Sequence, residues 1–269
     1  MNLTINLTRK CNKRCSYCYI KKSKQEIDFR RFKEIVSKVD PQIVTLTGGE
    51  PFLYSKISKI INLLNQRGCC VRIFSNGRVP AKQISNVLHE KGAELFISYN
   101  EHDKKTLKNL RLLNNKGVSI CINHVFKNSS ISYHERLVSE IGFIKKINFL
   151  YPLKIGVANI KMFSPTEWYN KLEKIKPIIS NAGMNGFYET SFIKAEHSVL
   201  EIEKVYPCKT GFFLDTNGLI YPCCFMTEHF KGRSVPSSIL SPFKCEILKK
   251  YRSEDPNYKR ICPLILSTL

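Results

Sequence analysis

The sequence lacks any stretch that would cross a membrane or direct export. Nowhere do about 18 apolar residues follow one another, the length that a spanning helix needs. The first segment, Met1 to Lys10, has no apolar core of a secretion signal. We therefore expect a cytoplasmic protein without a membrane span.

Acidic residues are also few, and the excess of positive charge is spread along the chain. The 22 Asp and Glu stand against 43 Lys and Arg, which gives a net charge of +21. Basic pairs such as Arg9-Lys10, Lys104-Lys105 and Lys259-Arg260 lie far apart, without a long basic block or an RNA-binding pattern of aromatic residues. Spread charge is typical of solvated surfaces, so we expect no nucleic-acid partner, whereas an acidic peptide would suit this charge.

Cysteine, in contrast, is plentiful, with 11 in the chain. Without a secretion signal, these thiols are expected to be metal ligands rather than disulfides. Cys11, Cys15 and Cys18 follow an alternating β run at Leu3–Thr8, so they lie in a loop that leaves a strand. Zinc normally takes four ligands, whereas three thiolates on an iron–sulfur cubane would leave one iron open to a small molecule.

Strands and helices alternate through residues 1–162. We expect strands at 3–8, 43–47, 71–74, 95–98, 118–126 and about 147–151, with helices at 27–39, 56–67, 80–91, 103–115 and 132–145. Such alternation predicts right-handed βαβ units and a parallel sheet. Six units are too few for a closed eight-unit barrel, so the sequence predicts an α/β fold with a partial (β/α)6 TIM-like barrel.

The pattern changes in residues 163–269, which we expect to form a second, smaller domain. A helix is predicted from Ser164 to about Ser180. Apolar runs on both sides of Asn217-Gly218 predict a hairpin with a two-residue turn, which brings Cys208 and Cys223 near each other. We therefore expect a helix followed by a small cysteine-rich region.

Polar residues and glycines gather in the loops after the strands, where open parallel sheets build their sites. These loops are 11–18, 48–51, 75–77 and 98–100. Their residues resemble the radical S-adenosylmethionine (SAM) superfamily. The first loop reproduces its CxxxCxxC motif, with the aromatic Tyr17 before the third cysteine, and Gly48-Gly49-Glu50-Pro51 reproduces its GGEP motif. In the fourth loop, Asn100-Glu101 replaces the family's usual Asp-Gly.

The resemblance implies a [4Fe–4S] cluster held by Cys11, Cys15 and Cys18, with SAM on its fourth iron. The reduced cluster of such enzymes cleaves SAM to a 5′-deoxyadenosyl radical, which abstracts a substrate hydrogen. The resemblance also implies an electron donor such as flavodoxin or ferredoxin. The SAM contacts that it implies are Tyr17, Gly48, Gly49, Glu50, Pro51, Ser75, Asn76 and Ser98. Among them Glu50 would accept a hydrogen bond from the amino group of SAM, and the glycines would let the backbone approach it.

The C-terminal cysteines resemble the auxiliary-cluster regions called twitch and SPASM. Cys208 and Cys223, with a glycine five residues before the second, match the opening of that region. Further ligands would be Cys262 and either Cys245 or Cys224, enough for one auxiliary [4Fe–4S] cluster. A structural zinc site built from the same thiols is the alternative.

Three functions remain open. The first is oxidative modification of a peptide or protein side chain. Because the strand–helix series begins at Leu3, we expect this sequence to lack the leader-binding domain of many peptide-modifying relatives. The second is dehydrogenation or epimerisation of a small molecule such as a sugar or aminoglycoside. The third, a zinc protein that binds nucleic acid without catalysis, leaves the GGEP motif unexplained.

If the protein is an enzyme, His124 near the end of the fifth strand is a candidate polar contact to cofactor or substrate.

Overall fold

A nine-stranded sheet with helices on one side forms the described part of the protein. The structure, a computed structural model, describes residues 2–88, 92–100, 103–126, 130–151, 158–159, 163, 165–188 and 211–221. The strands are β1 (Asn2–Thr8), β2 (Ile43–Gly48), β3 (Cys70–Ser75), β4 (Glu94–Ser98), β5 (Ile120–Val125), β6 (Lys146–Leu150), β7 (Asn185–Tyr188), β8 (Gly211–Leu214) and β9 (Ile220–Tyr221). The helices are α1 (Phe29–Val39), the short 3-10 helix η1 (Pro51–Leu53), α2 (Ile57–Gln66), α3 (Ala81–Leu88), α4 (Lys104–Asn115), α5 (Ile131–Ile141) and α6 (Pro165–Asn181).

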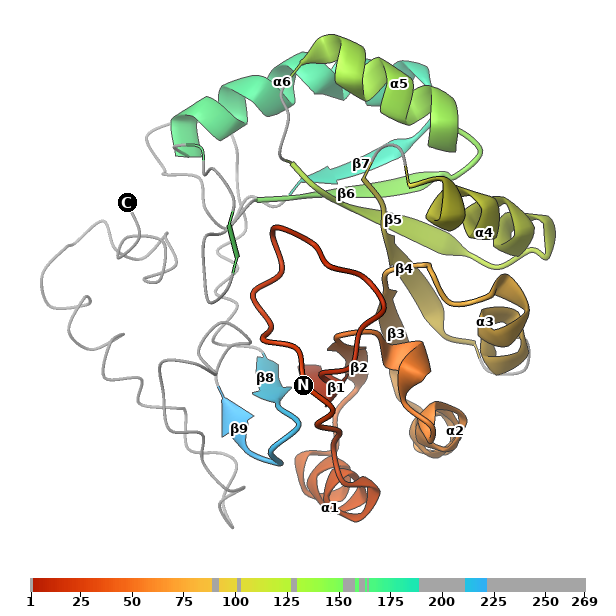
Figure 1. Ribbon diagram of the computed structural model, residues 1–269, viewed down its shortest axis with the longest axis vertical. Helices are drawn as coiled ribbons and strands as arrows, with labels where there is room; N and C mark the ends of the chain where they lie inside the picture. Colours follow the sequence, from red (N-terminus) through yellow and green to blue (C-terminus); the bar gives the residue numbers. More distant parts are fainter. Residues whose placement is uncertain are drawn as a thin grey trace, which may run out of the picture.

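The sheet is mostly parallel and open. Its order is β7-β6-β5-β4-β3-β2-β1-β8-β9, and every neighbouring pair is parallel except β8 and β9. Figure 1 shows the strands in an arc with the helices on its outer side. In the described part of the chain, β7 and β9 do not pair with each other to close the barrel. The predicted α/β fold with a partial TIM-like barrel is thus confirmed.

Local sequence signals explain where the helices begin. Asp28, Asp103 and Ser130 precede α1, α4 and α5, and each side chain accepts a hydrogen bond from a backbone N–H in the first turn. In α1 the apolar residues recur at helical spacing and are buried: Phe32, Ile35, Val36 and Val39. Capping and periodicity therefore agree, and both are local in sequence.

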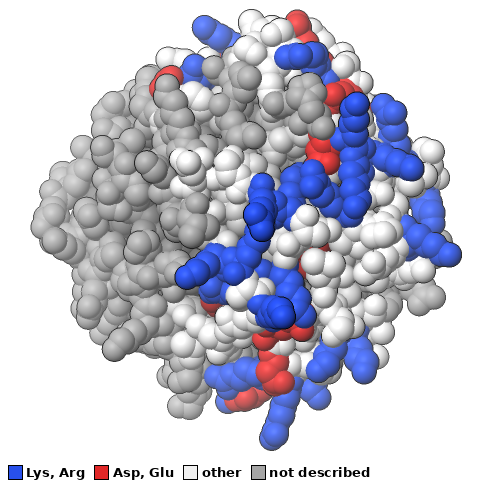
Figure 2. Space-filling view, viewed as in Figure 1, with Lys and Arg blue, Asp and Glu red and all other residues white. Residues whose placement is uncertain are grey.

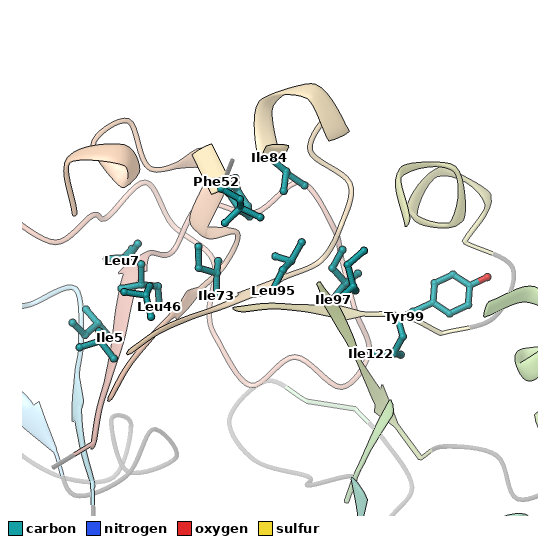
Figure 3. Close-up of a cluster of buried hydrophobic side chains, with 14 of the residues drawn as sticks. Ile5, Leu7, Leu46, Phe52, Ile73, Ile84, Leu95, Ile97, Tyr99 and Ile122 are labelled. Carbon is teal, nitrogen blue, oxygen red and sulfur yellow. The ribbon is translucent and has the colours of Figure 1, made fainter. Parts of the chain in front are cut away.

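Side chains that alternate along the strands form the core between the sheet and its helices. In Figure 3, Phe52 of η1 and Ile84 of α3 meet these strand residues from the helical side. The fully buried strand residues and strand neighbours labelled there are Ile5, Leu7, Leu46, Ile73, Leu95, Ile97, Tyr99 and Ile122. This continuous apolar layer fixes the strand ends, so the loops that follow them start from rigid positions.

The intervening residues face the inside of the arc, and several of them are polar. Asn6 lies on β1, and Asn123 and Asn148 lie side by side on β5 and β6. The Asn148 amide donates to Oδ1 of Asn123 at 2.9 Å. The inner surface is thus partly polar, with Phe74 and Phe96 in ring contact among its apolar members, whereas the surface that faces the helices is mainly apolar.

The region after residue 162 differs from its prediction in two details. β7 follows α6 and pairs with β6, although residues 183–204 show no clear period in the sequence. The hairpin turn has three residues between Asp215 and Leu219, which are joined by a 3.1 Å hydrogen bond, with Gly218 at φ 75° as the left-handed residue. The domain boundary at 162/163 stays a prediction, with β7 and β8 paired to strands that precede it.

Candidate functional site

The loop that follows β1 carries three cysteines and lies within the arc of strands (Figure 1). Cys11, Cys15 and Cys18 are partly exposed free thiols. A turn joins two of them, because the backbone N–H of Cys18 donates to the carbonyl oxygen of Cys15 at 3.2 Å. Burial raises the pKa of the Cys18 thiol, against a lowering contribution from a hydrogen bond with the Ile20 backbone. The predicted ligands therefore share one compact loop, named here the cysteine loop (residues 9–28).

The chemistry of this donor set fits a cubane better than a single ion. Among the described residues, no three Cys, His, Asp or Glu side chains are placed to bind one metal ion. The thiolates of a cubane bind different iron atoms, so they need not converge on one point. A loop with three thiols at the edge of a parallel sheet thus suits a [4Fe–4S] cluster with one iron left for SAM.

Two glycines hold the start of the cysteine loop against β2. The backbone N–H of Gly49 donates to the Thr8 carbonyl at 2.7 Å, and that of Glu50 donates to the Lys10 carbonyl at 2.8 Å. A Cβ atom on Gly49 would lie 2.2 Å from the Lys10 carbonyl oxygen. One on Gly48, whose φ is 136°, would lie 2.4 Å from the Thr8 carbonyl oxygen. The glycines are needed for this close approach of two backbones, and their predicted contact with SAM stays a prediction.

Glu50 is fully buried and joins the ends of β2 and β3. Its Oε1 accepts from the backbone N–H of Phe52 at 3.2 Å and from the Ser75 hydroxyl at 3.0 Å, and its Oε2 accepts from the backbone N–H of Asn76 at 2.8 Å. Burial raises the pKa of Glu50 to about 7, although these hydrogen bonds act in the opposite direction. An ionised carboxylate has about four acceptor positions, so Oε2 keeps one for a further donor. Pro51, also a predicted contact, begins η1 directly after Glu50.

Asn76 connects the end of β3 to the cysteine loop. Its amide nitrogen lies 3.5 Å from Sγ of Cys11 and donates to Oδ1 of Asn12 at 2.7 Å. Its own Oδ1 accepts from the backbone N–H of Arg78 at 2.8 Å, which fixes the orientation of the amide. Hydrogen bonds to cluster sulfurs influence the reduction potential, so Asn76 is placed to tune a cluster on Cys11.

Tyr17 reaches the end of the fourth strand through Asn100. The Asn100 amide donates to the Tyr17 hydroxyl at 2.7 Å. Burial raises the pKa of Tyr17, and the Cys15 thiol beside it acts in the same direction. Asn100 replaces the family's usual Asp, and here it binds the aromatic residue of the cysteine motif. Ser98, the last residue of β4, is half-buried.

Sequence reasoning missed an ion-pair cluster around Asp103. Lys13 of the cysteine loop lies 2.6 Å from Oδ2 of Asp103, and Arg78 lies 3.1 Å from the same oxygen. Burial alone would raise the pKa of Asp103, but hydrogen bonds from Lys13, the Thr106 backbone and Arg78 hold it below its usual range. Asp103 also caps α4, and the capping position was its only local signal.

The remaining candidates do not join this site in the described structure. His124 is buried on the helix-facing side, with its Nδ1 3.0 Å from the Tyr99 carbonyl oxygen and its ring against Tyr133 of α5. The predicted auxiliary ligands lie outside the described residues: Cys208, Cys223, Cys224, Cys245 and Cys262. Only the hairpin between the first two, β8 and β9, is described. Among the described helices, none is long and apolar enough to span a membrane.

Comparison with known proteins agrees with this geometry. Residues 5–127 match the family model of the Radical SAM superfamily. The S-adenosylmethionine-dependent nucleotide dehydratase of Psychrobacter lutiphocae is 23% identical over 65% of this chain and 65% of its own length. The antilisterial bacteriocin subtilosin biosynthesis protein AlbA of Bacillus subtilis is 23% identical over 97% of this chain and 64% of its own length. The chain thus spans slightly less than two thirds of these relatives.

Solved structures show the same fold. Streptococcus suis SuiB bound to S-adenosylmethionine superimposes with a TM-score of 0.78 at 17% identity, over 100% of this chain and 74% of SuiB. SuiB was also solved with its precursor peptide SuiA, and that structure gives a TM-score of 0.77 at 17% identity, over 96% of this chain and 65% of SuiB. Residues 5–127 of this chain thus match the radical SAM superfamily, whose members use a [4Fe–4S] cluster and SAM, and the cysteine loop and the open parallel sheet agree with that match.

Proposed function

We propose that this protein oxidises a side chain of a peptide or protein by radical SAM chemistry. The observation that carries the proposal is the convergence of the cysteine loop with Gly49, Glu50 and Asn76 at the carboxyl edge of the sheet. The peptide as substrate class is supported by the likeness to AlbA and SuiB, the latter solved with a precursor peptide. The polar inner face beside this edge, with Asn123 and Asn148, offers amide groups that suit a peptide backbone.

In this proposal the chain's residues bind, orient and exclude water, while the cofactors supply the radical. Cys11, Cys15 and Cys18 would hold the cluster, which when bound and reduced would supply the electron for cleavage of SAM to a 5′-deoxyadenosyl radical. Glu50 would accept from the amino group of SAM through its remaining position on Oε2. Asn76 would hold its amide against the sulfur of Cys11. The substrate would then lose a hydrogen atom to the radical, which becomes 5′-deoxyadenosine.

A complete oxidation requires a second electron to leave the substrate. We propose that Cys208, Cys223, Cys262 and either Cys245 or Cys224 would hold one auxiliary [4Fe–4S] cluster, which would supply an acceptor for that electron, while a proton would depart to solvent. The substrate would then undergo a two-electron oxidation and lose two hydrogens. One would leave as an atom to the 5′-deoxyadenosyl radical, and the other as a proton to solvent and an electron to the auxiliary cluster. Because this cysteine-rich chemistry requires reduced thiols, we also propose a cytoplasmic location.

The cysteine loop also offers a surface for the electron donor. The loop, residues 9–28, contains two carboxylates, Glu26 and Asp28, and seven basic residues: Arg9, Lys10, Lys13, Arg14, Lys21, Lys22 and Lys24. Figure 2 shows basic side chains gathered over the region where Figure 1 places this loop. Arg14, Lys21 and Lys24 are exposed and form no ion pair within the described structure. We propose that an acidic flavodoxin or ferredoxin docks on this surface, since opposite charges steer such encounters.

A second candidate is dehydrogenation or epimerisation of a small molecule. The likeness to the nucleotide dehydratase of Psychrobacter lutiphocae favours it, since that relative is named for action on a nucleotide, which is a small molecule. The two candidates separate in one experiment with reconstituted, dithionite-reduced enzyme. Peptides encoded beside the gene and a pool of nucleotides, sugars and aminoglycosides would each be tested for stimulation of 5′-deoxyadenosine release. A peptide product lighter by two hydrogens supports the first proposal, and a modified small molecule with unmodified peptides contradicts it.

A further inference from the structure

A buried carboxylate from the C-terminal hairpin contacts the base of the cysteine loop. Asp215 follows β8 directly, and its side chain is 1% exposed. Its Oδ1 accepts from the Asn6 amide at 2.6 Å, and its Oδ2 lies 2.6 Å from Nη2 of Arg9. The Arg9 Nε also donates to the Thr216 hydroxyl at 3.3 Å. Arg9 stands two positions before Cys11, so the hairpin is tied to the chain just ahead of the first predicted cluster ligand.

Arg9 holds both arms of the cysteine loop through its backbone. Its N–H donates to the Gln25 carbonyl at 2.8 Å, and its carbonyl accepts from the Ser23 N–H at 3.3 Å. The outgoing arm at Arg9 and the returning arm at Ser23 and Gln25 are thereby joined across the base of the loop. A shift of Arg9 would therefore move both arms together.

The hairpin that supplies Asp215 is itself fixed at several points. β8 pairs in parallel with β1 from Asn2↔Gly211 to Ile5↔Leu214. At the turn, Arg31 of α1 donates from Nε to the Gly218 carbonyl at 3.4 Å. The hairpin therefore holds the Asp215 carboxylate in a fixed position. Removal of its charge would leave the Arg9 guanidinium without its buried ionic partner, and breaking such a buried pair is costly in free energy.

We infer that Asp215 is a positioning residue for the cysteine loop and acts through Arg9. The hairpin lies in sequence between Cys208 and Cys223, so this contact would also couple the C-terminal cysteine region to the cluster at Cys11–Cys18. Only that consequence for clusters rests on the proposed function. The positioning of the loop is a property of the protein without metal.

Thiol labelling of the reduced, metal-free full chain tests the inference. Iodoacetamide rates at Cys11, Cys15 and Cys18 would be measured by mass spectrometry in wild type and in Asp215→Asn. We expect labelling of the loop cysteines to rise by about tenfold, the effect of losing one charge-assisted hydrogen bond. Buried Cys121 reports global unfolding and should keep its rate. Glu94→Gln, which breaks the exposed Arg72–Glu94 pair at 2.9 Å, is the matched control and should change nothing at the loop.

Unchanged labelling of the loop cysteines in Asp215→Asn would overturn the inference. So would a rise at Cys121 equal to that at the loop, since it would mean a loss of the whole fold. Arg9→Gln serves as the second variant, because it leaves the Asp215–Asn6 hydrogen bond in place. If Arg9 and Asp215 act as one unit, the loop cysteines of the double variant should label no faster than those of either single variant. A rate increase in the double variant equal to the product of the two single increases would contradict the inference. A failure of the wild type to cleave SAM would contradict the proposed function, but it would not affect the thiol-labelling test, which uses metal-free protein.

Discussion

The Asn76 amide nitrogen lies 3.5 Å from Sγ of Cys11, although 65 positions separate the two residues. The same residue donates its backbone N–H to Glu50, and Glu50 donates its own to Lys10 beside that cysteine. The ends of β1, β2 and β3 are therefore joined in a closed circuit of hydrogen bonds. This circuit places a titratable group, an amide and a predicted iron ligand next to one another.

Removal of the Asn76 amide should change the potential of the cluster. In reconstituted Asn76→Ala we expect the midpoint potential to fall by about 40 mV, the one-electron equivalent of one hydrogen bond of about 1 kcal/mol. The donor stabilises the more negatively charged reduced state, so its loss favours oxidation. A redox titration followed by electron paramagnetic resonance measures the shift. Asn62→Ala, at an exposed position of α2, is the control, and an equal potential in Asn76→Ala and wild type would refute the role.

The raised pKa of Glu50, about 7, predicts a pH-dependent stability. Its folded-state pKa exceeds the unfolded value, so its contribution to stability is full below about pH 4.5 and is lost as the pH rises through 7. Between about pH 5 and pH 8 the free energy of unfolding of wild type should fall by about 2 kcal/mol more than that of Glu50→Gln. Urea titrations of the metal-free protein at the two pH values give this difference. The exposed Glu94→Gln variant should follow wild type, and parallel curves for wild type and Glu50→Gln would count against the buried acid.

A side chain at Gly49 should separate the cysteine loop from β2. The added Cβ in Gly49→Ala would lie 2.2 Å from the Lys10 carbonyl oxygen, and both backbones must move. We expect a loss of about 2 kcal/mol in the free energy of unfolding and a lower iron content after reconstitution. Gly117→Ala is the matched control. Its φ of 72° would strain an alanine, but the added Cβ would meet no atom within 4 Å. If Gly49→Ala matches this control in stability and iron content, the steric account fails.

Charge reversal on the cysteine loop should affect a protein donor and spare a chemical one. For Lys21→Glu/Lys24→Glu we expect reduction of the cluster by flavodoxin to slow by about tenfold at low salt, with little change at high salt. Reduction by dithionite should stay near the wild-type rate. Stopped-flow absorbance follows both reactions. The reversal Lys104→Glu/Lys108→Glu on exposed positions of α4 is the control, and equal slowing in both variants would indicate net charge instead of a docking surface.

The auxiliary ligands can be tested by iron content. Cys223→Ala should bind less iron and sulfide than wild type after anaerobic reconstitution, yet retain some cleavage of SAM, because the cysteine loop is unchanged. Chemical iron and sulfide assays measure the loss. Cys70→Ala removes an exposed thiol at the start of β3 and is the control. Equal iron in the wild type and the Cys223 variant would defeat the auxiliary cluster, and zinc in its place would support the structural alternative.

The sheet and its loops were predictable because their signals are local. Helix caps such as Asp28, apolar periodicity in α1 and the alternation of strands with helices all lie within a few residues of one another. The site is predictable at the level of its loops for the same reason. β7 was missed because Asn185–Tyr188 is a four-residue strand at the edge of the described sheet, too short for a clear alternation.

The contacts between loops were not predictable from the sequence. Lys13 and Asp103 are 90 positions apart and Arg9 and Asp215 are 206 apart, so no local pattern links them. His124 could have been placed correctly, since it shares strand parity with the buried Ile120 and Ile122, and that parity faces the helices. The sequence therefore predicts that four loops lie at one edge of the sheet, and the structure adds which side chains join them.

The central claim, that the cysteine loop holds a cluster that cleaves SAM, has one direct measurement. Wild type and Cys15→Ala, both reconstituted anaerobically and reduced with dithionite, would be incubated with SAM, and 5′-deoxyadenosine would be quantified by liquid chromatography. The account predicts 5′-deoxyadenosine from wild type and none above background from Cys15→Ala. Wild-type protein that binds zinc without iron or sulfide, or equal cleavage by both proteins, would contradict it.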